Sequence, residues 1–227
     1  MDRGILFIEI YKLFKRRRAW IGPVLVFLLI IISFPLTLDI NSDNPPQIYL
    51  SFIWISTLLV TMLGTELIFS DDFEDGSLEQ YAVNNQLIEV VFYKILVHWA
   101  LIGIPLAFVA FIFILSLNIS IHISSIALLC LIISNLIFIN FFSLGNALSL
   151  KKGSILGLLI TIPFLIPVLI VLGKMTTSAL LGLSLVGHLS LLVGVMILVA
   201  SFIPLIISFI LRTHLEYQKK PIYYFCD

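Results

Sequence analysis

The sequence predicts an all-α integral membrane protein with six transmembrane helices, preceded by an amphipathic interfacial helix. Hydrophobic residues make up 60% of its 227 residues and charged residues only 11%, whereas soluble domains are about 45–50% apolar and about 25% charged. The mean hydropathy is +1.15. Six apolar runs approach or exceed the length of about 20 residues that crosses a bilayer core. Lipid is therefore the predicted solvent for most of this chain.

The predicted spans cover about residues 21–38, 48–70, 95–117, 123–145, 154–173 and 183–211. The last run is long enough to tilt in the bilayer, or to include a break near Pro204. With the helix that precedes them, the spans form a single transmembrane domain over residues 1–212. Residues 213–227 are predicted to form a cytoplasmic tail.

The helix predicted before the first span covers residues 5–18. At 100° per residue its apolar face consists of Leu6, Phe7, Ile10, Leu13 and Phe14. Its polar face consists of Glu9, Lys12, Lys15 and Arg16. A basic amphipathic helix beside a span lies in the membrane interface. There are two interpretations of such a helix: it is an anchor with no further role, or it is an elbow that also braces an intracellular partner.

Lysine and arginine predict the orientation, because they concentrate on the cytoplasmic side of membrane proteins. Basic residues flank alternate ends of the spans: Arg3, Lys12, Lys15, Arg16, Arg17, Arg18, Lys94, Lys151, Lys152, Arg212, Lys219 and Lys220. Lys174 is the one exception. Both termini are thus predicted on the cytoplasmic or matrix side of a bacterial inner membrane or mitochondrial inner membrane.

The segment from Glu66 to Glu89, which joins the second and third spans, carries seven of the thirteen acidic residues. Its central segment is Asp71, Asp72, Phe73, Glu74, Asp75, Gly76, Ser77, Leu78, Glu79 and Gln80. Acidic residues contribute little to orientation, so membrane insertion does not explain them. One interpretation is a solvated loop. The other is a short helix across the membrane face, capped or bent near Gly76, that docks a protein partner through its charges and through Phe73 and Leu78.

Lys94 and His98 are spaced i, i+4, so they share a helix face and are possible partners of the acidic segment. The other histidines, His122, His188 and His214, are far apart in sequence. Neither a catalytic site nor a metal or cofactor site is predicted for this chain alone.

Several reaction and ligand classes are disfavoured. The formal net charge is zero, which gives no basic field for nucleic acid. HExxH and GxSxG patterns are absent from the sequence, so an enzyme is not expected. The glycine-rich GxxxxGK pattern that cradles ATP phosphates is absent too, so any ATPase that drives this protein must be another chain.

Proline and glycine give the spans candidate packing or hinge positions. Pro163 and Pro167 lie one turn apart in the fifth span, and Pro105 lies in the third. Each removes a backbone hydrogen bond and favours a bend. Gly153 and Gly157 form a GxxxG step that permits close helix approach. Static packing and a gating hinge are both open interpretations.

The segment from Glu66 to Gln80 resembles the signature of the heme exporter protein B family, the membrane subunit of the cytochrome c maturation ATP-binding cassette (ABC) transporter. The neighbourhoods of Lys94, His98 and Pro105, Lys151-Lys152-Gly153, and the two prolines of the fifth span are also similar. The resemblance covers about residues 1–212. Residues 81–86 are more polar than that family's pattern, and the tail from residue 212 extends beyond it.

The resemblance implies an ABC permease subunit that serves heme export or delivery for c-type cytochromes. It implies as partners a separate ATPase that binds ATP, a second copy of the permease and other membrane subunits that handle heme. The acidic segment would couple to the ATPase, so reversal of Asp72 and Asp75 should be more harmful than reversal of Glu9. A permease for another substrate and a non-transporting scaffold for an assembly complex are the alternatives.

The predicted orientation can be tested with single cysteines placed at Asp43, Ser120 and Lys152 in a chain that lacks Cys130 and Cys226. An impermeant maleimide added from outside should label positions 43 and 120 and leave 152 protected, because the basic connections stay inside. Labelling at 152 with protection at 43 would reverse the orientation.

Overall fold

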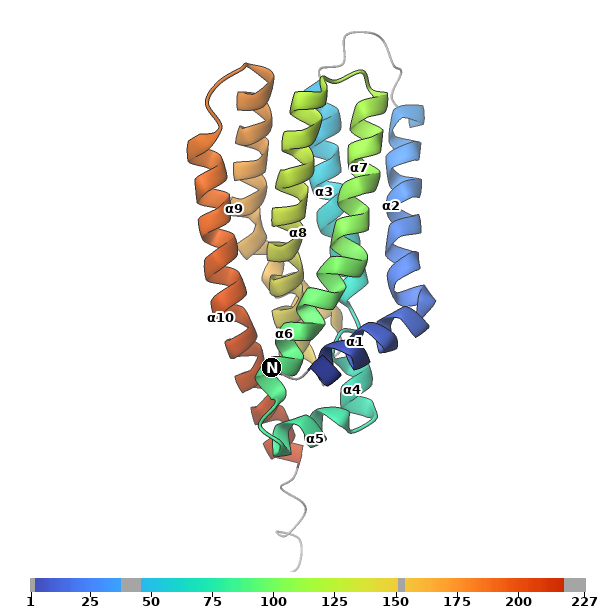
Figure 1. Ribbon diagram of the computed structural model, residues 1–227, viewed down its shortest axis with the longest axis vertical. Coiled ribbons are helices and arrows are strands. Elements are labelled where there is room, and N and C mark those ends of the chain that lie inside the picture. The colour runs from blue at the N-terminus through green and yellow to red at the C-terminus, as the bar shows by residue number, and fades with distance from the viewer. Residues whose placement is uncertain (1–2, 38–45, 151–153, 219–227) are drawn as a thin grey trace, which may run out of the picture.

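The computed structural model describes residues 3–37, 46–150 and 154–218, and every regular element within those ranges is helical. Six helices or helix combinations are long and apolar enough to cross a membrane, which confirms the predicted all-α integral membrane fold. They stand side by side as an elongated bundle (Figure 1). Gly153 and the connections that carry Asp43 and Lys152 lie outside the described residues.

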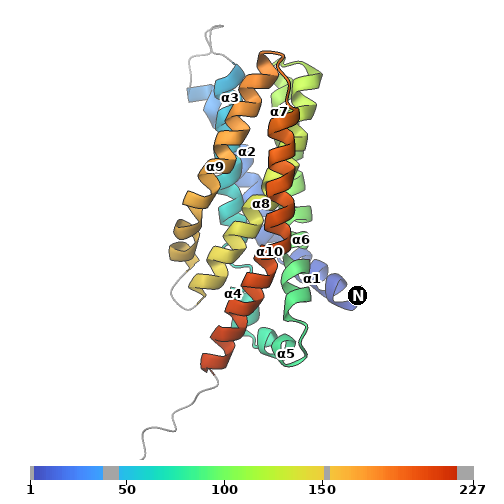
Figure 2. The ribbon, with the colours of Figure 1, turned by 90° about the vertical axis from the view of Figure 1, so that its left-hand side faces the viewer.

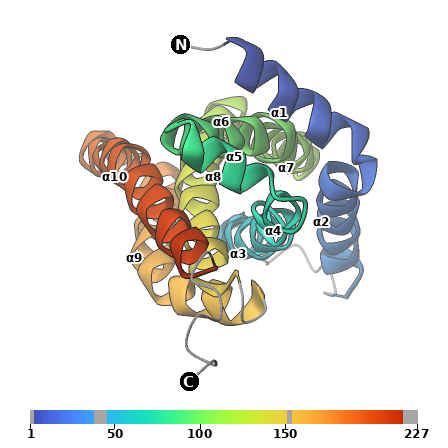
Figure 3. The ribbon, with the colours of Figure 1, turned by 90° about the horizontal axis from the view of Figure 1, so that it is seen from below.

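The first two helices meet in an elbow. The interfacial helix α1 (Arg3–Lys15) ends before Arg16, and the first span α2 (Arg17–Thr37) begins directly after it. The continuous helix predicted over 5–18 is therefore interrupted at Arg16. Helix α1 runs across the lower part of the bundle, whereas α2 stands along it (Figures 1 and 3).

The predicted apolar face of α1 is divided in the structure. Leu13, together with Ile5, packs inward, and Ile5 contacts Val90 and Tyr93. Phe7 and Phe14 point outward and are 71% and 55% exposed. Two apolar stripes on opposite sides suit a helix that lies between a protein surface and a bilayer surface.

The second span α3 (Pro46–Thr65) leads into two short helices, α4 (Ser70–Glu74) and α5 (Ser77–Val83). The third span combines α6 (Leu87–His98), a π-helical turn η1 (Trp99–Gly103) and α7 (Ile104–Ser116). The π turn ends two residues before Pro105, whose nitrogen cannot donate to the carbonyl four residues earlier, within that turn.

The remaining spans are single long helices: α8 (Ile121–Ser149), α9 (Ser154–Leu180) and α10 (Val186–Gln218). Helix α9 continues through Pro163 and Pro167, and α10 continues through Pro204 without a break. Because α10 reaches Gln218, the predicted tail begins with helical residues. The lower end of α10 extends beyond the other spans beside α4 and α5 (Figure 2).

Helix α8 packs against α9, α10, α3 and α7, and polar side chains take part in these contacts. The Asn135 amide Nδ2 donates to the Gly103 carbonyl at 3.0 Å, and Trp99 Nε1 donates to the Ile132 carbonyl at 2.9 Å. In lipid, helices associate through close packing and such polar contacts, because apolar side chains gain nothing by leaving lipid for protein. These bonds join α8 to the third span around its π turn.

The close packing between α8 and α9 can be tested by a substitution at Gly157. A Cβ atom added there would overlap the Gly145 carbonyl of α8, whereas a Cβ at Gly173 of the same helix would meet nothing within 4 Å. We therefore expect Gly157→Ala to cost about 1–3 kcal/mol through overpacking and to lower the detergent-state Tm by about 3 °C or more. Gly173→Ala is the matched control. Equal Tm values for the two variants would contradict the close approach.

Candidate functional site

The acidic segment folds as α4 and α5 with a sharp turn between them. Gly76 precedes α5 with a φ of +76°, the left-handed conformation that glycine adopts readily and β-branched residues resist. The Ser77 backbone N–H donates to Asp75 Oδ1 at 2.9 Å. Hydrogen bonding from Ser77 holds the pKa of the Asp75 carboxyl below its usual value. The segment is thus a structured turn of two helices with the bend that the sequence predicts at Gly76.

Burial divides this segment into two groups of residues. Asp72 and Leu78 are 4% and 0% exposed and anchor it to the bundle. The exposed residues of α4, α5 and the turns after them are Glu74, Asp75, Gly76, Gln80, Val83, Asn84 and Asn85. We call these seven residues the projecting surface, since α4 and α5 lie below the spans in Figures 1 and 2. These residues are available to a protein that approaches from that side.

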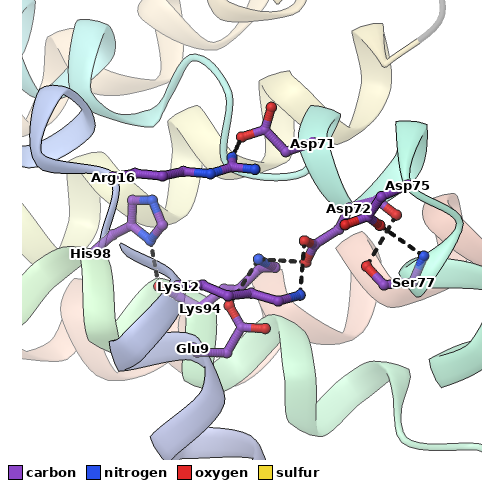
Figure 4. Close-up of polar contacts among 9 residues, drawn as sticks. All are labelled: Glu9, Lys12, Arg16, Asp71, Asp72, Asp75, Ser77, Lys94 and His98. Carbon is purple, nitrogen blue, oxygen red and sulfur yellow. Dashed lines mark hydrogen bonds and ion pairs between the residues drawn. The ribbon is translucent and has the colours of Figure 1, made fainter. Parts of the chain in front are cut away.

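A buried cluster of charges holds the segment in place (Figure 4). Lys94 Nζ of α6 lies 2.6 Å from Asp72 Oδ2 of α4 and 2.8 Å from Glu9 Oε2 of α1. The three side chains are each less than 10% exposed. Lys94 therefore joins three segments that are far apart in the sequence. We call Glu9, Lys12, Asp72 and Lys94 the elbow cluster.

Lys12 and Arg16 of the elbow complete the connection to α4. Lys12 Nζ lies 3.1 Å from Asp72 Oδ1 and 6.0 Å from the centre of the Tyr81 ring. Burial alone would lower the pKa of Lys12, but the neighbouring Asp72 carboxylate raises it above its usual value. Arg16 forms a further ion pair with Asp71. Lys12 of α1, Arg16 at the junction of α1 and α2, and Lys94 of α6 thus bind the two adjacent aspartates, Asp71 and Asp72.

The elbow cluster is electrically balanced, with two carboxylates and two ammonium groups. Removing charges from water is costly, and the ion pairs offset that cost only while every partner is present. Loss of one partner from a buried pair typically costs about 3–5 kcal/mol. The cluster therefore requires α1, α4 and α6 to keep one mutual arrangement.

Glu9 has a different role from the one expected of the polar face of α1. Its side chain is 4% exposed and bound to Lys94, so reversal of its charge would place two ammonium groups together in a buried site. Reversal of Glu9 is therefore expected to destabilise the bundle, and whether it is milder than reversal of Asp72 and Asp75 stays a prediction. Asp72 is equally buried, and its reversal would disrupt the bundle before it could report on any partner.

The structure places the two suggested partners of the acidic segment differently. Lys94 contacts Asp72 directly, as described above. His98 is 8% exposed, and its Nδ1 lies 2.8 Å from the Lys94 carbonyl one turn earlier on the same helix. It forms no ion pair with a carboxylate among the described residues. Its polar contact is thus with the backbone that carries Lys94.

Sequence reasoning missed Glu9, Lys12 and Arg16 as members of this site. The helical period did contain a signal, because positions 5, 9, 12, 13 and 16 share one face at steps of three and four residues. That face mixes charge with Ile5 and Leu13, which hid it from a search for purely apolar or purely polar faces.

A cavity of about 790 Å³ lies beside the elbow cluster. It is open on one side and is lined by the end of α1, the first turns of α2, the end of α3 with the residues that follow it, α4, and two residues of α6, Lys94 and His98. All four residues of the elbow cluster are among its lining residues, and so are Arg16 and Asp71 of the neighbouring ion pair.

These features define a polytopic α-helical membrane protein with a rigid charged segment fixed between its second and third spans. A family model described as CcmB protein matches residues 5–214, and the chain belongs to that family. A similar protein from Pseudomonas aeruginosa, named heme exporter protein B, is 31% identical over 203 residues, which are 88% of this chain and 91% of that one.

A Haemophilus influenzae protein of the same name is 32% identical over 220 residues, covering 93% of this chain and all of that one. A Rhodobacter capsulatus protein with that name is 28% identical over 213 residues, which cover 90% of this chain and 96% of the relative. The family match over residues 5–214 includes the elbow, the six predicted spans and the acidic segment, so the family resemblance seen in the sequence is confirmed over nearly the whole chain.

Lys94 offers a direct test of the elbow cluster. Lys94→Met keeps an unbranched side chain of similar length but leaves Glu9 and Asp72 as buried carboxylates without their shared cation. We expect a loss of about 3–5 kcal/mol, measured as a detergent-state Tm lower by about 10 °C.

The control is Arg212→Met, which breaks an exposed pair with Glu216 and should cost about 0.5 kcal/mol or less. A Lys94→Met protein that is as stable as the Arg212→Met protein would show that the buried ion pairs do not hold the elbow.

Proposed function

We propose that this chain is the permease subunit of an ATP-driven ABC transporter that serves heme export, with its ATPase on a separate chain. Family membership supports the transport assignment, and the name of the relatives, heme exporter protein B, supports heme as the substrate. The absence of the GxxxxGK pattern from the sequence supports a partner that binds ATP. We further propose that the complex lies in a bacterial or mitochondrial inner membrane and serves c-type cytochrome maturation.

The observation that carries the proposal is the rigid attachment of the projecting surface to the spans. An ABC permease has to convert closure of soluble ATPase domains into movement of membrane helices, so the contact must not be flexible. Asp72 binds Lys94 of α6, and Leu78 is fully buried in the core. A force applied to α4 and α5 would therefore pass directly into the third span and the elbow.

The third span has a place where such a movement can be absorbed. The π turn Trp99–Gly103 separates α6, which carries Lys94, from α7. π turns have a different hydrogen-bond register from α-helix and are frequent at functional sites. In this proposal α6 follows the ATPase contact while α7 stays packed on α8. Two ATPase domains would act on two copies of the permease.

Within the proposed complex, this chain couples closure of the ATPase to movement of the membrane helices. It also forms a path for the cargo through the membrane, or supports the subunits that do. Heme is treated as cargo of the assembly and is not assigned to a site formed by this chain alone. Other heme-handling membrane subunits are proposed partners. Both termini are proposed on the side where the ATPase binds, which is the side of α4 and α5.

Glu74 allows a test that leaves the elbow cluster intact. It is exposed on the projecting surface, and its side chain has no ion pair among the described residues. We expect Glu74→Lys to weaken binding of the ATPase by about tenfold or more, because reversal of a contacting interface charge costs about 2 kcal/mol or more. The measurement is the amount of ATPase that co-purifies in mild detergent, with heme-stained c-type cytochromes as the functional readout.

Glu89→Lys is the matched control, since it reverses an equally exposed carboxylate of α6 outside the projecting surface. Its ATPase content and cytochrome level should stay near those of the unmodified protein. Unchanged ATPase content in Glu74→Lys would remove the coupling role from this surface. Normal cytochromes after complete deletion of the protein would remove the heme assignment instead.

A further inference from the structure

The cavity beside the elbow has a marked excess of positive charge. Six basic and four acidic side chains line it, which leaves two positive charges in excess. The basic residues are Lys12, Lys15, Arg16, Arg17, Arg18 and Lys94. Glu9, Asp71 and Asp72 are already bound by Lys94, Arg16 and Lys12. Lys15, Arg17 and Arg18 form no ion pair within the described part of the chain, and all three are exposed.

Another part of the cavity lining is apolar. It includes Pro23 and Val26 of α2 together with Leu63 and Leu67 at the end of the second span. Leu63 and Leu67 are 46% and 59% exposed. Val26 follows Arg18 by eight helical residues, a rise of about 12 Å. The cavity therefore changes from cationic to apolar in the direction in which the span enters the bilayer.

The outward aromatic side chains of α1 fix the level of the cavity in the membrane. Phe7, Tyr11 and Phe14 are 71%, 60% and 55% exposed, and the ring of Phe14 stacks on that of Trp20 with 5.7 Å between centroids. Aromatic side chains on an amphipathic helix settle at the boundary between headgroups and acyl chains. Arg17 and Arg18, at the junction of α1 and α2, then lie at the level of the lipid phosphates.

We propose that this cavity is a binding site for an anionic phospholipid, with the headgroup phosphate on Arg17 and Arg18. Arginine binds phosphate through two parallel hydrogen bonds, and basic pockets between spans on the cytoplasmic side attract anionic headgroups. The acyl chains lie along Val26, Leu63 and Leu67. The bound lipid fills the space between the elbow and the end of α3. This site goes beyond the transport function proposed above and does not depend on it.

The first test removes the two unpaired arginines. The full chain, purified and delipidated in detergent, is titrated with dioleoyl-phosphatidylglycerol or with dioleoyl-phosphatidylcholine, and bound lipid is counted by native mass spectrometry. We expect phosphatidylglycerol to bind with preference. Arg17→Gln/Arg18→Gln should weaken its binding by about tenfold for each charge-assisted hydrogen bond that is removed. Lys174→Gln/Arg212→Gln removes two positive charges away from the cavity and should bind as the unmodified chain does.

A second variant keeps every charge and so protects the test from a change in membrane orientation. Gly22 lines the cavity, and a Cβ added there meets nothing within 4 Å. A side chain can therefore start from this position without a clash at its Cβ, and Gly22→Phe should place an aromatic ring in the part of the cavity next to Arg18. We expect it to reduce phosphatidylglycerol binding at least as strongly as the arginine double variant does, with an unchanged Tm in the absence of lipid.

Three results would overturn the proposal. Equal binding of the two lipids would remove the requirement for an anionic headgroup. Displacement of phosphatidylglycerol by millimolar inorganic phosphate would indicate a simple anion site. Binding of heme with a shifted Soret band, abolished in Gly22→Phe, together with no preference for phosphatidylglycerol, would assign the cavity to heme.

Discussion

The ammonium group of Lys94, buried between two carboxylates, forms the interaction on which the mutual arrangement of α1, α4 and α6 depends. Glu9 lies 85 positions from Lys94 in the sequence, and Asp72 lies 60 positions from its second cationic partner, Lys12. In a site of low dielectric constant, an unpaired charge costs far more than it does in water, so none of these groups can leave without the others. The acidic segment, which would otherwise be an independent loop, becomes part of the helix bundle.

The bundle itself uses a different kind of constraint. Along α8, close backbone approach at Gly157 and hydrogen bonds such as that from Asn135 to Gly103 replace the hydrophobic driving force that lipid removes. Such contacts are short and specific, so they tolerate little displacement. The charged end and the apolar bundle are consequently stabilised by separate interactions that meet at α6, where Lys94 lies one turn before His98 and the π turn.

The six spans, the helix that precedes them and the turn at Gly76 could be predicted because each depends on neighbours in the sequence. Hydropathy reports the length of a span, and glycine reports a local backbone requirement. The role of Glu9 could not be predicted in this way, because it depends on which residue of a distant helix faces it. Periodicity placed Glu9 beside Lys12 on the polar face of the helix. A side chain on that face can be solvated by water, or it can bind a buried lysine of another helix, and periodicity does not distinguish the two. The same ambiguity concealed the division of the acidic segment into anchored Asp72 and exposed Glu74.

The ion pairs that hold α4 and the cavity have side chains in common, so movement of α4 and occupation of the cavity are thermodynamically coupled. Lys12, Arg16, Asp71, Asp72 and Lys94 belong to the ion pairs that fix α4, and they also line the space assigned to an anionic lipid. Any movement of α4 that separates Arg16 from Asp71 leaves these two charges facing the lipid without each other as a partner. By linkage, a lipid that binds one arrangement of these pairs more tightly shifts the equilibrium toward that arrangement, and the size of the shift is set by the difference between its two affinities. If α4 and α5 bind an ATPase, the membrane composition therefore acts on the same equilibrium that the ATPase drives.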